Sequence, residues 1–287
     1  MKNTYICLFL KTKMQTMNTP KVIVVLFLLL IVSACQTNPF TGKKGLALVS
    51  NSELFPQSFQ LYQETLKESK VIRGTAEAKM VDQVGRQIAE AAEKFLASTG
   101  QQGYLKDYRW EYALIESDQV NAWCMPGGKI AVYSGILPLT QNRAGLAVVM
   151  GHEVSHALLN HSQQQASQSQ ITNVIGMGGS TALSGTQFGS VFNQIYGIGT
   201  QLGVTLPYSR KFETEADELG LQLMAIAGYD PEVAIAFWER MNAAGGKAPA
   251  EFLSTHPSGQ SRINNLKGKV NEAKATARKF GVTQFQK

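Results

Sequence analysis

The stretch NRAGLAVVMGHEVSHALLNH, residues 142–161, decides the fold of this chain. Apolar side chains recur in it at three- and four-residue spacing, which predicts a helix with a buried face. His152 and His156 lie four residues apart, so on a helix their imidazoles are separated by roughly 40° around the axis and about 6 Å along it. Two neutral imidazoles on one helix face can bind one Zn²⁺. Glu153 can reach a metal-bound water but not the metal.

A catalytic zinc site needs a third protein ligand and one open position. His161 follows His156 by five residues, and no glycine turns the chain between them. We therefore expect His161 to be a C-terminal helix residue, favoured there by the helix dipole when it is charged, and not a ligand.

A better third ligand lies in the segment Glu213-Thr214-Glu215-Ala216-Asp217. Glu213 and Asp217 are four residues apart and share a helix face, so one carboxylate can bind zinc while the other orients a ligating imidazole. Glu215 points roughly 200° away from Glu213 and is expected to lie outside the site. A solvated acidic helix face is the alternative, and the upstream pair of histidines argues against it.

H-E-x-x-H followed by E-x-x-A-D resembles the gluzincin peptidase family of HtpX, BepA and the prenyl-protein CAAX endopeptidase. The resemblance covers essentially the whole chain after residue 34 and is closest to the periplasmic or lipoprotein branch, which includes BepA and LoiP. Three further segments match the family pattern: Asn121-Ala122-Trp123 with Pro126-Gly127-Gly128 and Gly135, Asn38-Pro39-x-Thr41-Gly42, and Thr255-His256-Pro257 with Arg262.

The resemblance implies roles for individual residues. It makes His152, His156 and Glu213 the ligands of one Zn²⁺. It makes Glu153 the catalytic base and Asp217 the carboxylate that orients a ligand.

Three interpretations of His256 stay open. Its imidazole can stabilise the oxyanion during catalysis, it can be a fourth zinc ligand in the resting enzyme, or it can be a plain surface histidine. We expect the polypeptide substrate to lie extended against the edge of a small sheet near Asn121, Ala122 and Trp123, adding a strand through main-chain hydrogen bonds.

The rest of the chain divides into further helices and this small sheet. Aromatic and branched residues predict three strands, at 108–115, 120–125 and 129–134. Apolar spacing and capping residues predict helices at 50–66, from 75 onward, and at 210–227, 230–240 and 258–279. The expected fold class is therefore α+β and mainly helical, a zincin-like metallopeptidase domain with about three strands beside the H-E-x-x-H helix.

The N-terminus has the pattern of an export signal. Residues 1–21 carry four lysines and no acid, and Val22–Ala34 is almost purely apolar. Val32-Ser33-Ala34-Cys35 resembles the bacterial lipobox, so we expect a lipoprotein-type signal peptide at 1–34. A lipidated Cys35 and a polar tether at 35–49 would follow, and then a zinc metallopeptidase domain at 50–287.

The distribution of charged residues argues against nucleic acid as a partner. It also distinguishes one segment, residues 162–209, from the rest of the chain. The net charge of +6 falls to about +2 when the four signal lysines leave, and no basic cluster remains to bind nucleic acid. Residues 162–209 contain no Asp, Glu, Lys or Arg. This Gln- and Gly-rich insert is either a helical hairpin packed on the domain or a mobile element that contacts substrate, partner or membrane.

The sequence therefore predicts a zinc-dependent metalloendopeptidase that cleaves misfolded or misassembled envelope proteins. The predicted location is the bacterial cell envelope, as an outer-membrane lipoprotein that faces the periplasm and is held at the membrane by its lipid anchor. The alternative is an envelope-protein assembly factor or chaperone with minor peptidase activity.

Overall fold

The computed structural model describes residues 35–176, 209–244, 256 and 259–287. The predicted signal segment 1–34 and most of the insert 162–209 lie outside these residues. Within the described part of the chain, no helix is long and apolar enough to cross a membrane. The longer helices are α3 (Asn51–Glu68), α4 (Ala76–Ser98), α6 (Arg143–Leu158), α7 (His161–Gly176), α9 (Arg210–Ile226), α10 (Val233–Ala244) and α12 (Gln260–Lys279).

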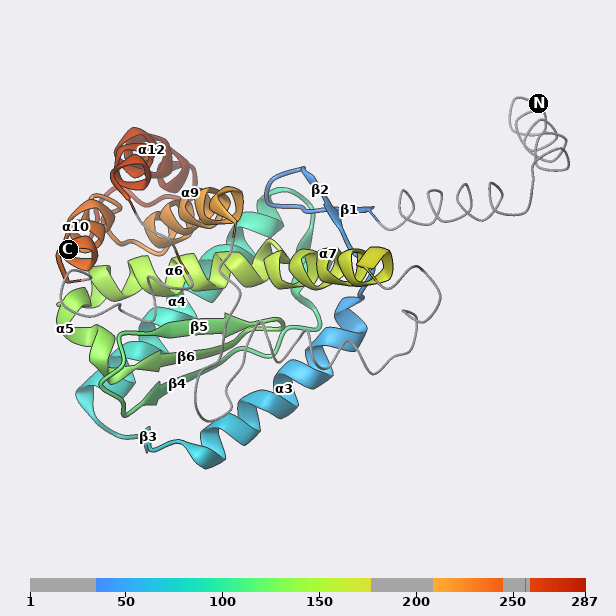
Figure 1. The fold of residues 1–287 in the computed structure, drawn as a ribbon. Coiled ribbons are helices and arrows are strands. Elements are labelled where there is room, and N and C mark those ends of the chain that lie inside the picture. Colours follow the sequence, from blue (N-terminus) through green and yellow to red (C-terminus); the bar gives the residue numbers. More distant parts are fainter. Residues whose placement is uncertain (1–34, 177–208, 245–255, 257–258) are drawn as a thin grey trace, which may run out of the picture.

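A four-stranded sheet lies among these helices in the order β3-β4-β6-β5 (Figure 1). The three predicted strands are present as β4 (Glu111–Ile115), β5 (Ala122–Met125) and β6 (Lys129–Tyr133). The two-residue strand β3 (Val71–Ile72) was not predicted, because two residues are too few to show a period. β4 and β6 are parallel, the other pairs are antiparallel, and β5 forms an edge of the sheet.

The two faces of the sheet are covered by different helices. On one face, Tyr62 of α3 donates a hydrogen bond to the carbonyl of Ile130 at 3.2 Å and meets Trp123 edge-on. On the other face, α4 approaches so closely that a Cβ on Gly85 would lie 2.2 Å from the Tyr112 ring. Alternation along each strand puts these partners on opposite faces, so the sheet has two buried sides and the fold is α+β and mainly helical.

Helices α6 and α9 cross at a contact between two glycines. A Cβ on Gly220 would lie 3.0 Å from the backbone nitrogen of His152, and one on Gly151 would lie 3.0 Å from the carbonyl oxygen of Gly220. Because neither residue has a side chain, the two backbones touch, and polar side chains near the crossing can meet between the helices.

The predicted helix 142–161 ends earlier than expected, because α6 stops at Leu158 and α7 begins at His161. Asn142 caps α6 by accepting a hydrogen bond from the nitrogen of Gly145 at 2.9 Å. The helix ends at Leu158 because Asn160 adopts a left-handed conformation with φ of 56°, which asparagine tolerates better than most residues. His161 therefore begins α7, and the expectation that it ends the first helix was wrong.

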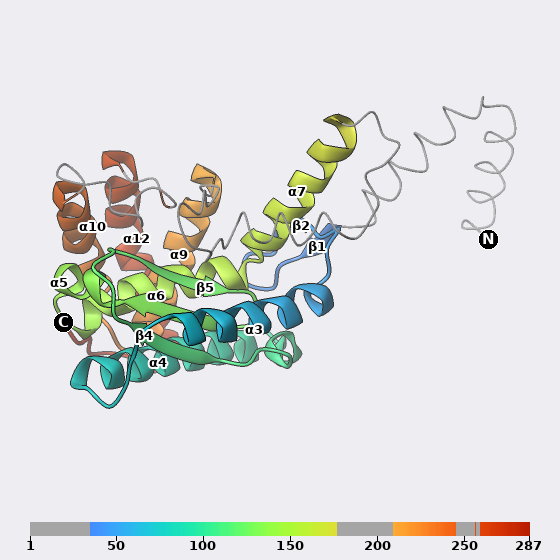
Figure 2. The same cartoon turned by 60° about the horizontal axis from the view of Figure 1, so that its bottom comes forward.

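The segment expected to be a polar tether forms an antiparallel pair of strands, β1 (Cys35–Thr37) and β2 (Lys44–Leu46). We call residues 35–46 the N-terminal hairpin. The amide of Asn38 donates to the carbonyl of Leu158, the last residue of α6, at 2.8 Å. Figure 2 shows α7 rising beside this hairpin. The hairpin is thus docked on the C-terminal end of α6.

Candidate metal centre

The chain has four histidines, and all four are buried close together. His152 and His156 project from α6, His161 begins α7, and His256 lies between α10 and α12. Isolated buried imidazoles need polar partners. Four of them at one place indicate a site that binds a metal.

Three of the histidines and one carboxylate converge on a single point. The Nε2 of His152 lies 3.1 Å from the Nε2 of His156 and 3.1 Å from the Nδ1 of His256. Glu213 Oε1 lies 3.0 Å from His256 Nδ1 and 3.3 Å from His156 Nε2. We call His152, His156, Glu213 and His256 the donor group, and their ligand atoms all lie within 4.8 Å of one another.

The spacing and chemistry of the donor group fit zinc. Ligand atoms at about 2.0–2.1 Å from a tetrahedral ion lie about 3.3–3.4 Å from one another. The observed separations of 3.0–3.4 Å are of this size. Imidazole nitrogens and a carboxylate oxygen are ligands that zinc prefers, and burial lowers the pKa of His156, so its ring stays neutral with a lone pair to offer. The residues present suit one zinc ion.

Asp217 and Arg262 hold the donor group from the far side of His152. Asp217 Oδ1 lies 3.0 Å from His152 Nδ1, the ring nitrogen that does not face the other donors. Arg262 contacts Asp217 at 2.6 and 2.8 Å and Glu213 Oε2 at 2.9 Å. Its guanidinium also stacks on Trp238, 3.6 Å from the ring centroid. One buried cation thus connects a carboxylate of the donor group with a carboxylate that orients His152.

Glu153 lies between the donor group and the edge of the sheet. Its Oε1 is 3.3 Å from the Nε2 of His256. Burial raises the pKa of this carboxyl to about 7, against the opposing effects of His256 and of a backbone hydrogen bond from Cys124. A buried carboxyl that titrates near neutrality can both take up and release a proton.

The residues predicted to bind substrate lie at the edge strand. Ala122 and Trp123 belong to β5, and Asn121 precedes it, with its carbonyl accepting a hydrogen bond from the nitrogen of Tyr133 at 3.0 Å. Among the described residues, β5 bonds to β6 on one side and to no strand on the other. The backbone of Cys124 in β5 donates a hydrogen bond to the carboxylate of Glu153. A peptide strand added at this edge would therefore run past the donor group.

His161 and Glu215, which the sequence interpretation excluded from the site, and Lys43, which it did not consider, line up on the other side of His156. His161 Nδ1 lies 2.9 Å from His156 Nδ1, and Glu215 Oε2 lies 3.4 Å from His161 Nε2. Lys43 of the N-terminal hairpin pairs with Glu215 Oε1 at 2.7 Å. Glu215 does point away from Glu213, as helix geometry requires, but α7 lies on that side of α9. The H-x-x-x-x-H spacing was the only signal of this contact in the sequence.

A buried His-His-Glu donor set with a buried glutamate beside it defines a zinc metallopeptidase. The comparison with known families agrees, because the model of "Peptidase family M48" matches residues 80–270. The chain therefore belongs to peptidase family M48 and is a metalloendopeptidase by class. Its cofactor is one zinc ion.

Several characterised proteins are similar to this chain. "Mitochondrial metalloendopeptidase OMA1" of Schizosaccharomyces pombe is 36% identical over 189 residues, which cover 65% of this chain and 53% of that protein. The human "Metalloendopeptidase OMA1, mitochondrial" is 25% identical over 259 residues, 86% of this chain and 48% of the relative. "Beta-barrel assembly-enhancing protease" of Escherichia coli is 29% identical over 170 residues, 57% of this chain and 35% of that protein. The chain spans about half the length of the OMA1 relatives.

These relatives correct the predicted location. Mitochondrial metalloendopeptidases of yeasts, a plant and vertebrates match the chain, which contradicts the location at a bacterial outer membrane; that prediction was wrong. It rested on a short signal and on the branch of the family that the N-terminal segment resembles. The lipid on Cys35 stays a prediction, and Cys35 is exposed at the start of β1.

Proposed function

We propose that this chain cleaves internal peptide bonds in unfolded or misassembled proteins and so serves protein quality control. The observation that carries the proposal is the position of Glu153. Its carboxyl lies 3.3 Å from a residue of the donor group and is hydrogen-bonded to the backbone of the edge strand β5. This position supports the proposal, because a carboxyl that can transfer a proton lies between the donor group and a strand edge to which an extended peptide could bond.

The roles follow from the contacts. His152, His156 and Glu213 would hold the zinc ion. When bound, the ion supplies a Lewis acid that polarises the peptide carbonyl and lowers the pKa of a water to about 7. Glu153 would accept a proton from the attacking water and pass it to the leaving amine. Asp217 accepts a hydrogen bond from His152 Nδ1 and thereby keeps the Nε2 of that ring directed at the donor group.

The edge strand accounts for the kind of substrate. An added strand bonds to the N–H and C=O groups of β5, which every peptide can do, and it needs the substrate to be extended. Folded proteins rarely offer a free extended segment, whereas unfolded or misassembled ones do. Recognition through the backbone therefore selects for conformation more than for sequence.

His256 closes the donor group in this structure. A catalytic zinc site keeps one open position for water or substrate, yet His256 Nδ1 lies 3.1 Å from His152 Nε2 and 3.0 Å from Glu213 Oε1. Of the three interpretations, the fourth zinc ligand of a resting enzyme agrees best with these distances. A zinc-edge absorption spectrum of a His256→Ala variant tests this point, since an unchanged zinc coordination shell excludes His256 as a ligand.

Glu153→Gln tests the peptidase assignment. The amide cannot accept the proton, so we expect casein cleavage to fall by 10²-fold or more, on the order of what a general base contributes, while zinc content stays at one ion per chain. Glu218→Gln is the matched control on α9, because Glu218 is partly exposed and pairs only loosely with Lys269 at 3.5 Å. Full cleavage by Glu153→Gln would refute the assignment.

The alternative of an assembly factor is favoured by one relative, since the name of the Escherichia coli protein connects that protein with β-barrel assembly. A scaffold or chaperone does not need proton transfer. Cells that depend on this chain should therefore survive with Glu153→Gln if assembly is its main role, and should fail if peptide hydrolysis is.

A further inference from the structure

The imidazole of His156 has contacts on both sides of its ring. Its Nε2 faces the donor group, at 3.1 Å from His152 Nε2, whereas its Nδ1 lies 2.9 Å from His161 Nδ1 on the opposite side of the ring. His161 cannot bind the same ion, because the imidazole of His156 stands between them. The ring of Phe212 stacks on that of His161 at 4.2 Å and 10° and fixes its plane.

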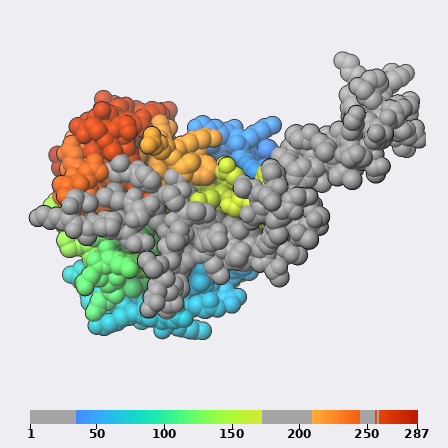
Figure 3. Space-filling model, in the orientation of Figure 1, coloured from blue at the N-terminus to red at the C-terminus, as the bar shows by residue number. Residues whose placement is uncertain are grey.

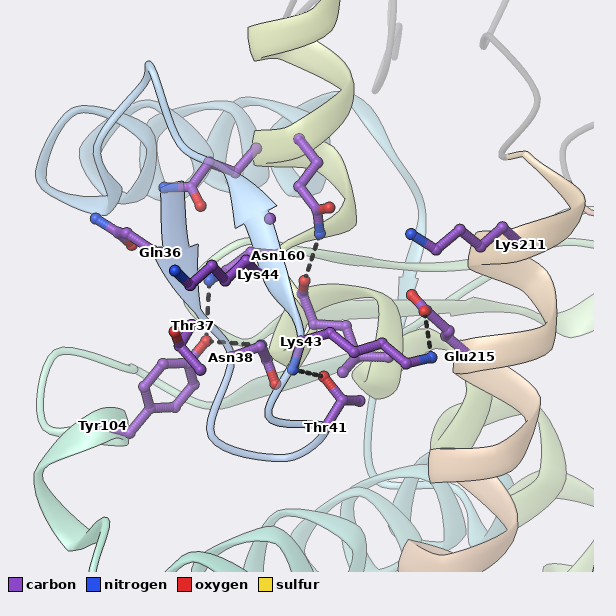
Figure 4. Close-up of a pocket in the computed structure, with 14 residues that line it drawn as sticks. Gln36, Thr37, Asn38, Thr41, Lys43, Lys44, Tyr104, Asn160, Lys211 and Glu215 are labelled. Carbon is purple, nitrogen blue, oxygen red and sulfur yellow. Dashed lines mark hydrogen bonds and ion pairs between the residues drawn. The ribbon is translucent and has the colours of Figure 1, made fainter. Parts of the chain in front are cut away.

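The contacts continue from His161 to the surface. His161 Nε2 lies 3.4 Å from Glu215 Oε2, and the other oxygen of Glu215 lies 2.7 Å from the ammonium of Lys43. Figure 4 shows Lys43 of the N-terminal hairpin reaching across to Glu215 on α9. In the space-filling view, the hairpin (blue) adjoins the exposed end of α9 (orange) (Figure 3). The contacts thus link three separate segments of the chain.

The donors and acceptors along these contacts fit one arrangement of protons. A neutral imidazole that offers Nε2 to a metal carries its proton on Nδ1. His156 then donates from Nδ1 to His161 Nδ1, and His161 must carry its own proton on Nε2, where it faces Glu215. An ionised carboxylate is an acceptor only, so one oxygen of Glu215 attracts the Nε2 proton of His161 across 3.4 Å and the other accepts a hydrogen bond from Lys43. Every contact then has one donor and one acceptor.

We propose that His161, Glu215 and Lys43 are positioning residues, a relay that holds His156 in the tautomer and orientation that present Nε2 to zinc. The proposal rests on the proposed role of His156 as a zinc ligand. It gives His152 and His156 equivalent support, because Asp217 contacts Nδ1 of the one ring at 3.0 Å and His161 contacts Nδ1 of the other at 2.9 Å.

The relay also makes the N-terminal hairpin part of the metal site. Lys43 lies outside residues 80–270, the part of the chain that matches the family model. A hydrogen bond fixes the position of the hairpin on α6: the side-chain amide of Asn38 donates to the carbonyl of Leu158 at 2.8 Å. The hydroxyl of Tyr104 donates to the same carbonyl at 2.9 Å. A shift of the hairpin would therefore move Lys43 away from Glu215 and, through His161, change the position of the His156 ring.

The expected effects differ along the relay. Loss of a residue that orients a metal ligand typically lowers metal affinity by about 10- to 100-fold, and we expect this for His161→Phe, which keeps an aromatic ring and removes both nitrogens. Glu215→Leu should give a loss of the same order. The side chain of Lys43 is 58% exposed, so Lys43→Met should weaken zinc binding by only about 1.5- to 5-fold, the range of an exposed ion pair.

The experiment measures the zinc dissociation constant of the full-length protein by competition with a chromophoric chelator. Lys44→Met, in the same hairpin, is the control and should bind zinc as the unmodified protein does. Glu215→Gln keeps an oxygen that can accept from His161, and Lys43→Arg keeps a cation, so both should restore most of the affinity that Glu215→Leu and Lys43→Met lose. A purely structural role would not predict this rescue.

A spectroscopic measurement reads the tautomer directly. With only four histidines in the chain, a long-range ¹H–¹⁵N spectrum of the zinc-loaded protein should show the proton of His156 on Nδ1, and Glu215→Leu should make that proton exchange faster. Unchanged zinc affinity and an unchanged Nδ1 signal in Glu215→Leu and His161→Phe would overturn the relay. If circular dichroism shows that His161→Phe does not fold, the result for Glu215→Leu alone decides whether the relay exists.

Different results would refute the relay and the zinc site on which the proposed function depends. If the His156→Ala variant binds zinc as tightly as the unmodified protein, the assignment of His156 as a ligand is wrong. Loss of zinc from His156→Ala together with normal affinity in both relay variants would refute only the relay.

Discussion

Replacing Arg262 by methionine should destabilise the metal-free protein severely. The side chain is buried, and its nitrogens contact Asp217 at 2.6 and 2.8 Å and Glu213 at 2.9 Å. Methionine keeps the apolar stem against Trp238 but removes the charge. Two carboxylates whose side chains are 2% and 4% exposed would then lose their shared cation.

The magnitude follows from the burial of the ion pairs. Breaking a buried pair by removing one partner costs about 3–5 kcal/mol, because the remaining charge is left without compensation. In a domain of this size, 1 kcal/mol changes the melting temperature by about 2–4 °C. Arg262→Met should therefore lower the melting temperature by roughly 6–20 °C.

The assay is urea unfolding and calorimetry in the presence of a chelator, so that zinc binding does not contribute. Lys267→Met is the matched control on α12, because Lys267 is half-exposed and lies 3.5 Å from Glu239; exposed pairs contribute about 0–1 kcal/mol. Adding Asp217→Asn to Arg262→Met should cost less than Asp217→Asn costs alone, since the two residues interact. If Arg262→Met unfolds like Lys267→Met, the argument from buried charge is wrong.

Two further predictions concern the helix crossing and the metal. Gly220→Leu should destabilise the protein by about 1–3 kcal/mol or more, because even a Cβ there would lie 3.0 Å from the His152 backbone nitrogen. Gly268→Leu is the control and should not destabilise the protein, because no atom lies within 4 Å of a new Cβ at that site. The urea midpoints of the two variants compare them directly. Removal of zinc with a chelator should abolish casein cleavage and lower the melting temperature, since free zinc at about 1,000 times its dissociation constant stabilises a folded protein by about 4 kcal/mol. Added zinc should reverse both changes. A melting temperature that is the same with and without chelator would show that the donor group holds no zinc.

Much of the site could be read from local spacing. His152 and His156 share a helix face because residues four apart always do, and the same rule pairs Glu213 with Asp217. Three of the four strands of the sheet could also be predicted, and so could the helix that Ser50 and Glu53 cap, since each depends on neighbours in the sequence. The location failed for a related reason. A short export signal and a lipobox-like motif are weak evidence about the compartment of a whole protein.

Other features depended on contacts between distant segments. Arg262 lies 45 residues from Asp217 and 110 from His152, and Lys43 lies 172 residues from Glu215. No period in the sequence reports such distances. The left-handed turn at Asn160 separates α7 from α6, and α7 then lies on the side of α9 that carries Glu215, which a helical wheel of α9 alone places in solvent.

The sequence by itself determined the chemistry of this protein, because helix geometry brings two imidazoles and a glutamate together within five consecutive residues. Only the tertiary structure decided how that chemistry is supported. The contact of Gly151 with Gly220 brings α6 and α9 close enough for Glu213 to join the histidines. Docking of the N-terminal hairpin places Lys43 behind them. Both depend on how whole elements pack, which no local pattern of residues specifies.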